Sequence, residues 1–202
     1  RDRCNIWDNP TKVSEEFKPE LLEKLPKVDT VNITGGEPFV REDIEDIVKI
    51  LFTKTKRIVF STSGYYSDRI IQLARKYPQL GFRISIEGLS CKNDELRGRP
   101  GGFDKGLKTL LELRRMGVKD IGFGITVSNN NSSDMLQLYE LNRNLKMEFA
   151  TASFHNSFYL KSCINSYCKC SIEWIALFIF YFPGCFRIPS IMNVRFLPQI
   201  TS

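Results

Sequence analysis

The stretch VNITGGEPFVRED, residues 31–43, decides the fold, because an apolar run stops there at two glycines and gives way to charged residues. Such a change is typical of a strand that ends where a helix is about to begin. Glycines let the backbone approach a ligand without a Cβ in the way, and Pro38 stiffens the exit of the turn. Glu37 adds a carboxylate that can receive an ammonium group. Taken alone, however, Gly35 and Gly36 fit an ordinary strand-to-helix turn better than a ligand site.

Outward from this stretch, short apolar runs alternate with helical patterns. The runs predict strands at residues 28–34, 57–63, 82–88, 121–127 and 147–154. Apolar residues at three- and four-residue spacing predict the helices between them, as at Ile44, Ile47, Val48 and Leu51 and again from Phe103 to Leu111 and from Met135 to Leu145. Asp68 and Ser133 are the expected helix N-caps.

Strands separated by single helices indicate a parallel sheet, because parallel neighbours need a crossover connection. The expected fold is therefore an α/β class, either a β/α barrel or an open sheet with helices on its outer face. In both folds the chemistry gathers beyond the carboxyl ends of the strands. Gly35, Gly36 and Glu37 stand at such an end.

Composition narrows the classes of function. A chain of 202 residues with 42% hydrophobic content can bury one sizeable core. The net charge of +6 comes from 29 basic and 23 acidic residues without a long basic run, so a nucleic-acid partner is not expected. No secretion signal is recognised at the start, and the apolar run at 174–182 is shorter than the roughly 20 residues of a membrane span. We therefore expect a cytoplasmic protein without a membrane partner.

The composition of the sequence changes near residue 160. Cys163, Cys168, Cys170 and Cys185 crowd the tail, which contains a single acid and no helix-period stripe. A buried C-terminal strand or helix is one explanation, and sequence that does not belong to the native fold is the other, which we favour. The expected division is a core at residues 1–159 and an irregular, cysteine-rich, apolar tail at residues 160–202.

Five motifs in order resemble the radical S-adenosylmethionine (radical SAM) superfamily. They are Cys4 in RCNIW, NITGGEPFVRED, STSG at 61–64, ISIEGLS at 84–90 and ELRGRPGGFDKGL at 95–107. The resemblance covers roughly residues 4–155 and is strongest to the branch of molybdenum-cofactor synthases and peptide maturases. It implies a partial (β/α)6 TIM-like barrel, here with its first strand missing.

The resemblance also implies the cofactors. Family members hold a 4Fe-4S cluster on a Cys-x3-Cys-x2-Cys loop, whose open iron binds SAM. The reduced cluster cleaves SAM, and the 5′-deoxyadenosyl radical takes a hydrogen atom from the substrate. The implied partners are a small-molecule or peptide substrate and an electron donor such as ferredoxin or flavodoxin. Peptide modification and cofactor biosynthesis both stay open.

The family's residues carry over one by one. Cys4 resembles the third cluster cysteine, and Gly35, Gly36, Glu37 and Pro38 form the motif that receives the SAM amino group. The resemblance places Ser63 near SAM or substrate, Ser85 in contact with SAM, and Arg97 against its carboxylate. A planar guanidinium suits that last task because it binds a carboxylate in two places. Gly122 and Val127 are candidates for the adenine, without a matching motif.

One departure concerns the cluster. Arg1 stands where the resemblance places the second cysteine, so we expect a fragment of an enzyme whose present chain is inactive. The alternatives are a catalytically inactive remnant and a phosphate-binding β/α-barrel enzyme, which the glycine-rich strand ends would also suit. Individually, Ser85 fits a buried hydroxyl and Arg97 a surface cation. His155, Cys91 and the tail cysteines fit structural or unassigned roles, with an auxiliary cluster in the tail as the less favoured option.

Overall fold

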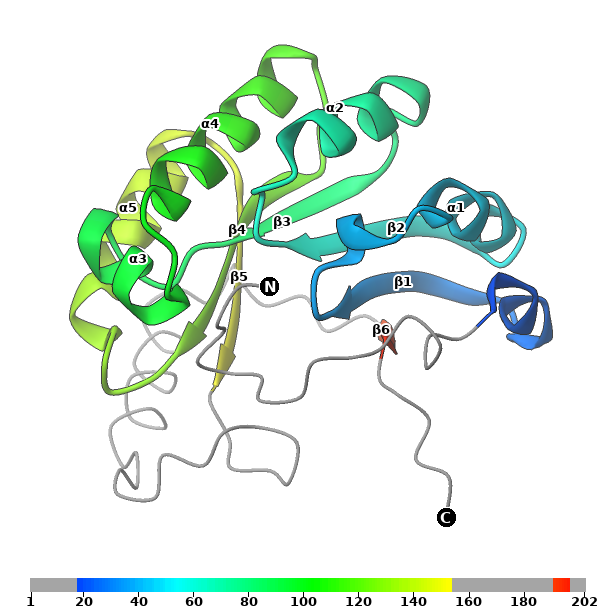
Figure 1. Ribbon diagram of the computed structural model, residues 1–202, viewed down its shortest axis with the longest axis horizontal. Helices are drawn as coiled ribbons and strands as arrows, with labels where there is room; N and C mark the ends of the chain where they lie inside the picture. The colour runs from blue at the N-terminus through cyan, green and yellow to red at the C-terminus, as the bar shows by residue number, and fades with distance from the viewer. Residues whose placement is uncertain (1–17, 154–190, 197–202) are drawn as a thin grey trace.

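The computed structural model of the chain describes residues 18–153 and 191–196. Its centre is a sheet of six parallel strands in the order β5-β4-β3-β2-β1-β6 (Figure 1). The strands are β1 (Val28–Gly35), β2 (Thr55–Thr62), β3 (Gly81–Ser85), β4 (Ile121–Val127), β5 (Glu148–Ser153) and β6 (Ile191–Phe196). The first five follow one another across the sheet in chain order, as in a barrel that closes only part of the way.

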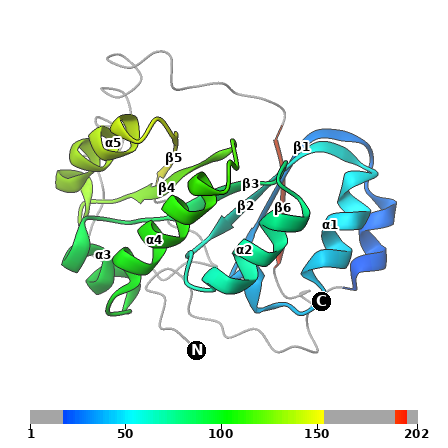
Figure 2. The same ribbon diagram turned by 90° about the horizontal axis from the view of Figure 1, so that it is seen from above.

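Helices connect the strands. The α-helices are α1 (Ile44–Phe52), α2 (Ser67–Lys76), α3 (Ser90–Arg97), α4 (Gly102–Arg115) and α5 (Met135–Asn144), and the short 3-10 helices are η2 (Pro19–Lys24), η3 (Pro38–Val40) and η4 (Ser132–Asp134). In both views α1, α2, α4 and α5 lie along one side of the sheet (Figures 1 and 2). The other face of the sheet therefore forms the inside of the half-barrel.

The hydrophobic core lies between the sheet and these helices. Ile33 of β1, Phe60 of β2 and Phe82 of β3 are paired across the strands and have no exposed surface. The ring of Phe39 from η3 lies 5.1 Å from that of Phe60, which in turn lies 5.8 Å from Phe82. Aromatic rings at such distances pack favourably. The turn after β1 is thus anchored in the core by its phenylalanine.

The inner face of the sheet carries polar or small residues instead, because successive side chains of a strand point to opposite faces. Along one row the paired residues are Ser61, Arg83 and Gly122, and the Ser61 hydroxyl donates a hydrogen bond of 3.1 Å to the Asn32 side chain of β1. A parallel sheet with an apolar outer face and a polar inner face is suited to hold a polar ligand inside the half-barrel.

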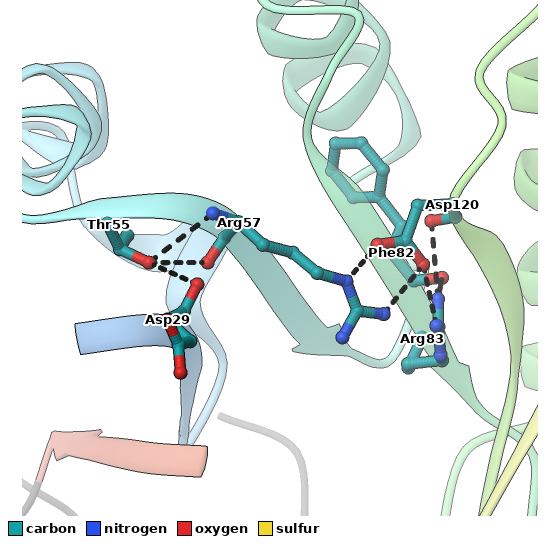
Figure 3. A network of polar contacts seen from close by, with 6 residues as sticks. All are labelled: Asp29, Thr55, Arg57, Phe82, Arg83 and Asp120. Carbon is teal, nitrogen blue, oxygen red and sulfur yellow. Dashed lines mark hydrogen bonds and ion pairs between the residues drawn. The ribbon is translucent and has the colours of Figure 1, made fainter. Parts of the chain in front are cut away.

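An ionic network closes the amino ends of the middle strands (Figure 3). Asp120, directly before β4, accepts hydrogen bonds from Arg57 Nε at 2.8 Å and from Arg83 Nη2 at 2.6 Å. Nearby, the Thr55 hydroxyl donates to the Asp29 carbonyl at 2.8 Å and so joins β2 to β1. Burial raises the pKa of Asp120, but the hydrogen bond from Arg57 and the charge of Arg83 outweigh it and hold the pKa below its usual value. These contacts tie β2, β3 and β4 together at the end opposite to the candidate site.

The α/β fold and the partial barrel expected from the sequence are confirmed, and all five predicted strands exist. The third strand ends at Ser85 rather than at residue 88, because the Glu87 amide donates to the Asn93 side chain instead of continuing the ladder. Both predicted N-caps are wrong. Asp68 lies inside α2, which begins at Ser67, and Ser133 lies in η4 ahead of α5.

β6 pairs in parallel with β1, with Asn193 opposite Asn32. It comes from the predicted tail and occupies the edge of the sheet beside the strand that leads into the two glycines. The remainder of residues 160–202 lies outside the described residues, as do Cys4 and His155. The division of the chain at residue 160 stays a prediction. No helix in the described part is long and apolar enough to cross a bilayer.

Candidate functional site

The turn after β1 contains two glycines with different requirements. Gly35 has a φ of 135°, which strongly favours glycine. Gly36 has no such φ, and a Cβ added there would meet nothing within 4 Å. The fold therefore requires the first glycine but leaves open space beside the second. A ligand is able to approach the backbone at Gly36.

The Glu37 carboxylate ties this turn to the end of β2. Its Oε1 accepts hydrogen bonds from the Thr62 hydroxyl at 2.6 Å and the Phe39 amide at 3.3 Å. Its Oε2 accepts from the amide and the hydroxyl of Ser63, at 2.8 and 2.5 Å. A carboxylate offers about four acceptor positions, so these four bonds occupy the side chain. Glu37 thus fixes the corner formed by Gly35, Gly36 and Glu37, which we call the Gly-Gly-Glu corner.

Arginines hold the outer side of the same turn. Arg69 of α2 donates to the Arg41 carbonyl at 2.6 Å and to the Val40 carbonyl at 3.3 Å. Arg41 in turn binds both carboxylate oxygens of Asp43. Pro38, predicted as part of the ligand motif, is buried at the first position of η3. The whole segment is therefore held in place before any ligand arrives.

Ser85 is the last residue of β3 and is half-buried. Its Cα partner is Gly124 on β4, and the preceding pair, Thr62 and Ile84, places the start of the β2–α2 loop beside it. A Cβ at Gly124 would meet only Arg83 Cβ, at an ordinary 3.7 Å, so packing does not require glycine at that position. The structure thus brings Glu37 and Ser63 into contact and places Ser85 at the end of the adjacent strand.

Arg97 is the last residue of α3 and forms an ion pair with Glu87. Its Nη1 donates to Glu87 Oε1 at 3.2 Å, while Glu87 Oε2 accepts from the Thr126 amide of β4 at 2.8 Å. The side chain of Glu87 is 7% exposed and that of Arg97 is 23% exposed. Burial raises the pKa of Glu87, opposed by the charge of Arg97 and the Thr126 amide. The sequence analysis missed Glu87, although an acid inside the apolar run ISIEG was a signal for it.

Further side chains join the loops at this end of the sheet. Asp94 accepts from the amides of Gly101 and Phe103 and so holds the start of α4. Burial raises the pKa of Asp94, but these hydrogen bonds outweigh it and lower the pKa overall. The Arg99 guanidinium lies 3.2 Å from the centre of the Tyr65 ring, which connects this loop to the loop after β2. Cation–π contacts of this kind are attractive.

The last loop is joined in the same way. Asp134, before α5, accepts from the Leu89 amide at 2.9 Å, and Asn131 bonds to the Thr126 carbonyl and to Ser128. Each loop beyond β1, β2, β3 and β4 is therefore fixed to another one by a side chain. Preorganised loops of this kind limit the conformational cost of binding a ligand.

The two adenine candidates fall in the core instead. A Cβ on Gly122 would lie 1.8 Å from the Glu148 carbonyl oxygen, so close strand packing already explains this glycine. Val127 has no exposed surface and belongs to the hydrophobic core. In the described part of the chain no three His, Cys, Asp or Glu side chains are grouped to hold a metal.

Comparison with known proteins identifies the family. The family model described as "Radical SAM superfamily" matches residues 5–141, and the chain belongs to that superfamily. Curated relatives include an Fe-coproporphyrin III synthase of Methanosarcina barkeri, 32% identical over 111 residues, and a pre-heme d1 synthase of Dinoroseobacter shibae, 30% identical over 139 residues. The first alignment covers 54% of this chain and 27% of the relative, and the second covers 66% and 34%.

A third relative is the sporulation killing factor maturation protein SkfB of Bacillus subtilis, 27% identical over 65% of this chain and 32% of the relative. The chain thus spans about a third of the length of these relatives. Among solved structures, SuiB of Streptococcus suis bound to S-adenosylmethionine superposes with a TM-score of 0.60 over 82% of this chain and 39% of SuiB, at 17% identity. That likeness supports the fold.

Proposed function

We propose that this chain forms the SAM-binding part of a radical SAM enzyme. The observation that carries the proposal is the Gly-Gly-Glu corner, which Glu37 fixes to Ser63 at the end of β2, next to Ser85. Family membership and the polar inner face of the half-barrel support it. A phosphate-binding barrel enzyme has no comparable support from the family match.

In this proposal the amino group of SAM lies at the Gly-Gly-Glu corner, in the space that Gly36 leaves open. The acceptor positions of Glu37 are already used, so Glu37 shapes the corner and backbone carbonyls receive the ammonium. Arg97 and Ser85 bind the carboxylate of SAM. Arg97 has N–H groups beyond the one given to Glu87, and a guanidinium carries five.

Cys4 is proposed to bind the 4Fe-4S cluster through its thiolate. It lies outside the described residues. A thiolate is the ligand type that iron–sulfur clusters use. When bound, the cluster and SAM supply the electron and the 5′-deoxyadenosyl radical that abstracts a hydrogen atom from the substrate. Whether the present chain is active by itself stays a prediction, with inactivity expected because Arg1 replaces a cysteine of the pattern.

The proposed substrate is a small molecule or a peptide. The relatives include enzymes named as cofactor synthases and as peptide maturases, among them the mycofactocin maturase MftC of Mycolicibacterium smegmatis, 27% identical over 61% of this chain. Neither class is favoured by a residue of the described part. A reduced ferredoxin or flavodoxin in the cytoplasm is the proposed electron donor.

Two measurements test the proposal. Calorimetry on the 202-residue chain is expected to show SAM binding, and the variant Ser85→Ala to weaken it, whereas Gln72→Ala on the exposed side of α2 serves as the matched control. After anaerobic reconstitution, the protein encoded by the whole gene is expected to be brown and to form 5′-deoxyadenosine from SAM when reduced. A colourless protein that neither binds nor cleaves SAM would refute the proposed function.

A further inference from the structure

Glu87 is a buried carboxylate at the meeting point of three elements. It follows the end of β3, binds Arg97 at the end of α3 through Oε1, and binds the Thr126 amide of β4 through Oε2. Its own amide donates to the buried Asn93 side chain at 2.9 Å. Both carboxylate oxygens and the backbone are therefore engaged, and each bond leads to a different part of the candidate site.

Burying this charge is unfavourable on its own. Removing a carboxylate from water is unfavourable unless partners compensate, and replacing a buried ion pair with well-packed apolar groups of similar volume is often neutral or even stabilising. The raised pKa of Glu87 reflects that cost. Stability alone therefore gives little reason for the Glu87–Arg97 pair. A requirement on the position of Arg97 gives a better one.

Arg97 needs such a support. An arginine side chain has many rotamers, and a guanidinium binds a carboxylate well only when its planar fork is aligned with the two oxygens. Glu87 takes one N–H group on Nη1 and leaves Arg97 partly exposed, with its remaining donors beyond that bond. The second bond of Glu87, to Thr126, fixes the carboxylate itself to β4.

We propose that Glu87 is a positioning residue that orients the Arg97 guanidinium toward the carboxylate of SAM. This inference rests on the proposed function, because it assumes that Arg97 meets that carboxylate. Glu87 itself does not touch the ligand. It acts as the fixed anchor between β4 and the end of α3, so that the guanidinium is already aligned when SAM binds.

Decarboxylated SAM provides the first test, since it lacks the group that Arg97 would bind. Arg97→Ala is expected to weaken SAM binding at least about tenfold, equivalent to about 1.4 kcal/mol, and to leave the affinity for decarboxylated SAM unchanged. Glu87→Gln is expected to weaken SAM binding without affecting decarboxylated SAM, and to cause no further loss of SAM affinity in the Arg97→Ala variant.

Glu95 is an exposed acid on the same helix as Arg97, so Glu95→Gln is the matched control and is expected to leave the affinity for both ligands unchanged.

The outcomes separate positioning from a structural role. If Glu87→Gln weakened both ligands equally, or lowered SAM affinity further in the Arg97→Ala background, Glu87 would be supporting the fold rather than Arg97, and the inference would be overturned. Glu87→Asp keeps the charge but shortens the side chain. Because the shorter side chain cannot hold the guanidinium in the same position, Glu87→Asp is expected to recover less than half of the SAM affinity that Glu87→Gln loses.

A second readout needs no ligand. The Nε–Hε signal of Arg97 in an NMR spectrum, assigned by its loss in Arg97→Lys, is expected to be sharp in the wild-type chain and in Glu95→Gln and to broaden or shift in Glu87→Gln. An unchanged signal in Glu87→Gln would refute the inference. If the wild-type chain bound no SAM, the proposed function would fail, while this measurement would still decide whether Glu87 fixes Arg97.

Discussion

Single residues at the Gly-Gly-Glu corner differ in why they have their identity. Gly35 is a glycine because of its backbone conformation, and Gly122 because β5 approaches it closely. Gly36 meets neither condition, since its φ is ordinary and its surroundings are open. A residue that the fold does not require but that borders the candidate ligand space is the best single position at which to separate binding from stability.

Gly36→Ala is therefore expected to keep the stability of the chain and to weaken SAM binding about tenfold or more, because the added methyl group occupies the ligand space. Gly35→Ala is the contrasting variant and is expected to lose about 1 to 3 kcal/mol of unfolding free energy, since alanine is strained at a φ of 135°. Urea denaturation and calorimetry with SAM measure the two effects. Equal SAM affinity in Gly36→Ala and the wild type would contradict the prediction.

At the scale of elements, the strands were predictable and the caps were not. Each of the five runs predicted as strands became a strand, as Ile121–Val127 did without any change of boundary. The predicted caps Asp68 and Ser133 are wrong because the N-cap positions are Tyr66 and Asp134, and Asp134 accepts from the distant Leu89 amide instead of capping α5. Contacts between elements that are distant in the chain cannot be read from local sequence signals.

The ionic network at the amino ends of β2, β3 and β4 makes a prediction at this scale (Figure 3). Asp120→Asn removes the negative charge to which both Arg57 and Arg83 bind. It is expected to lower the free energy of unfolding by about 1 to 3 kcal/mol near pH 7. The pair of Glu112 with the exposed Arg115 lies on one helix at the surface and provides the control, and Glu112→Gln is expected to show no measurable loss of unfolding free energy.

The same network sets a pH dependence. Because the pKa of Asp120 is lowered in the folded state, its stabilisation is complete above the ordinary Asp pKa of about 3.9 and is lost as the pH falls through the lowered value. The difference in unfolding free energy between the wild type and Asp120→Asn is therefore expected to shrink below about pH 4. Urea titrations at several pH values measure it. A difference independent of pH in the acid range would show that the charge is not the cause.

At the scale of the whole molecule, the sheet has an apolar face packed under the helices and a polar inner face. The outer face buries the aromatic group of Phe39, Phe60 and Phe82 under the helices. The inner face presents Asn32 and Ser61, which bond to each other. Since strand residues alternate between the faces, neighbours in the sequence serve different purposes.

Two adjacent substitutions in β2 test this division. Phe60→Ala is expected to lower the free energy of unfolding by about 3 to 5 kcal/mol, because it opens a cavity in a fully buried cluster. Ser61→Ala removes one hydrogen bond on the inner face and is expected to cost about 1 kcal/mol or less. Denaturant unfolding of both variants measures the difference. Similar losses in the two variants would contradict a one-sided core.

The sequence by itself determined the α/β class, the run of parallel strands and the Gly-Gly-Glu corner at a strand end, because alternation, helical spacing and turn residues are local properties of the chain. Only the tertiary structure decided that Glu37 accepts hydrogen bonds from Thr62 and Ser63, that Glu87 pairs with Arg97, and that β6 lies beside β1. These are contacts between segments far apart in the chain. They depend on how the strands are brought together, which no local pattern records.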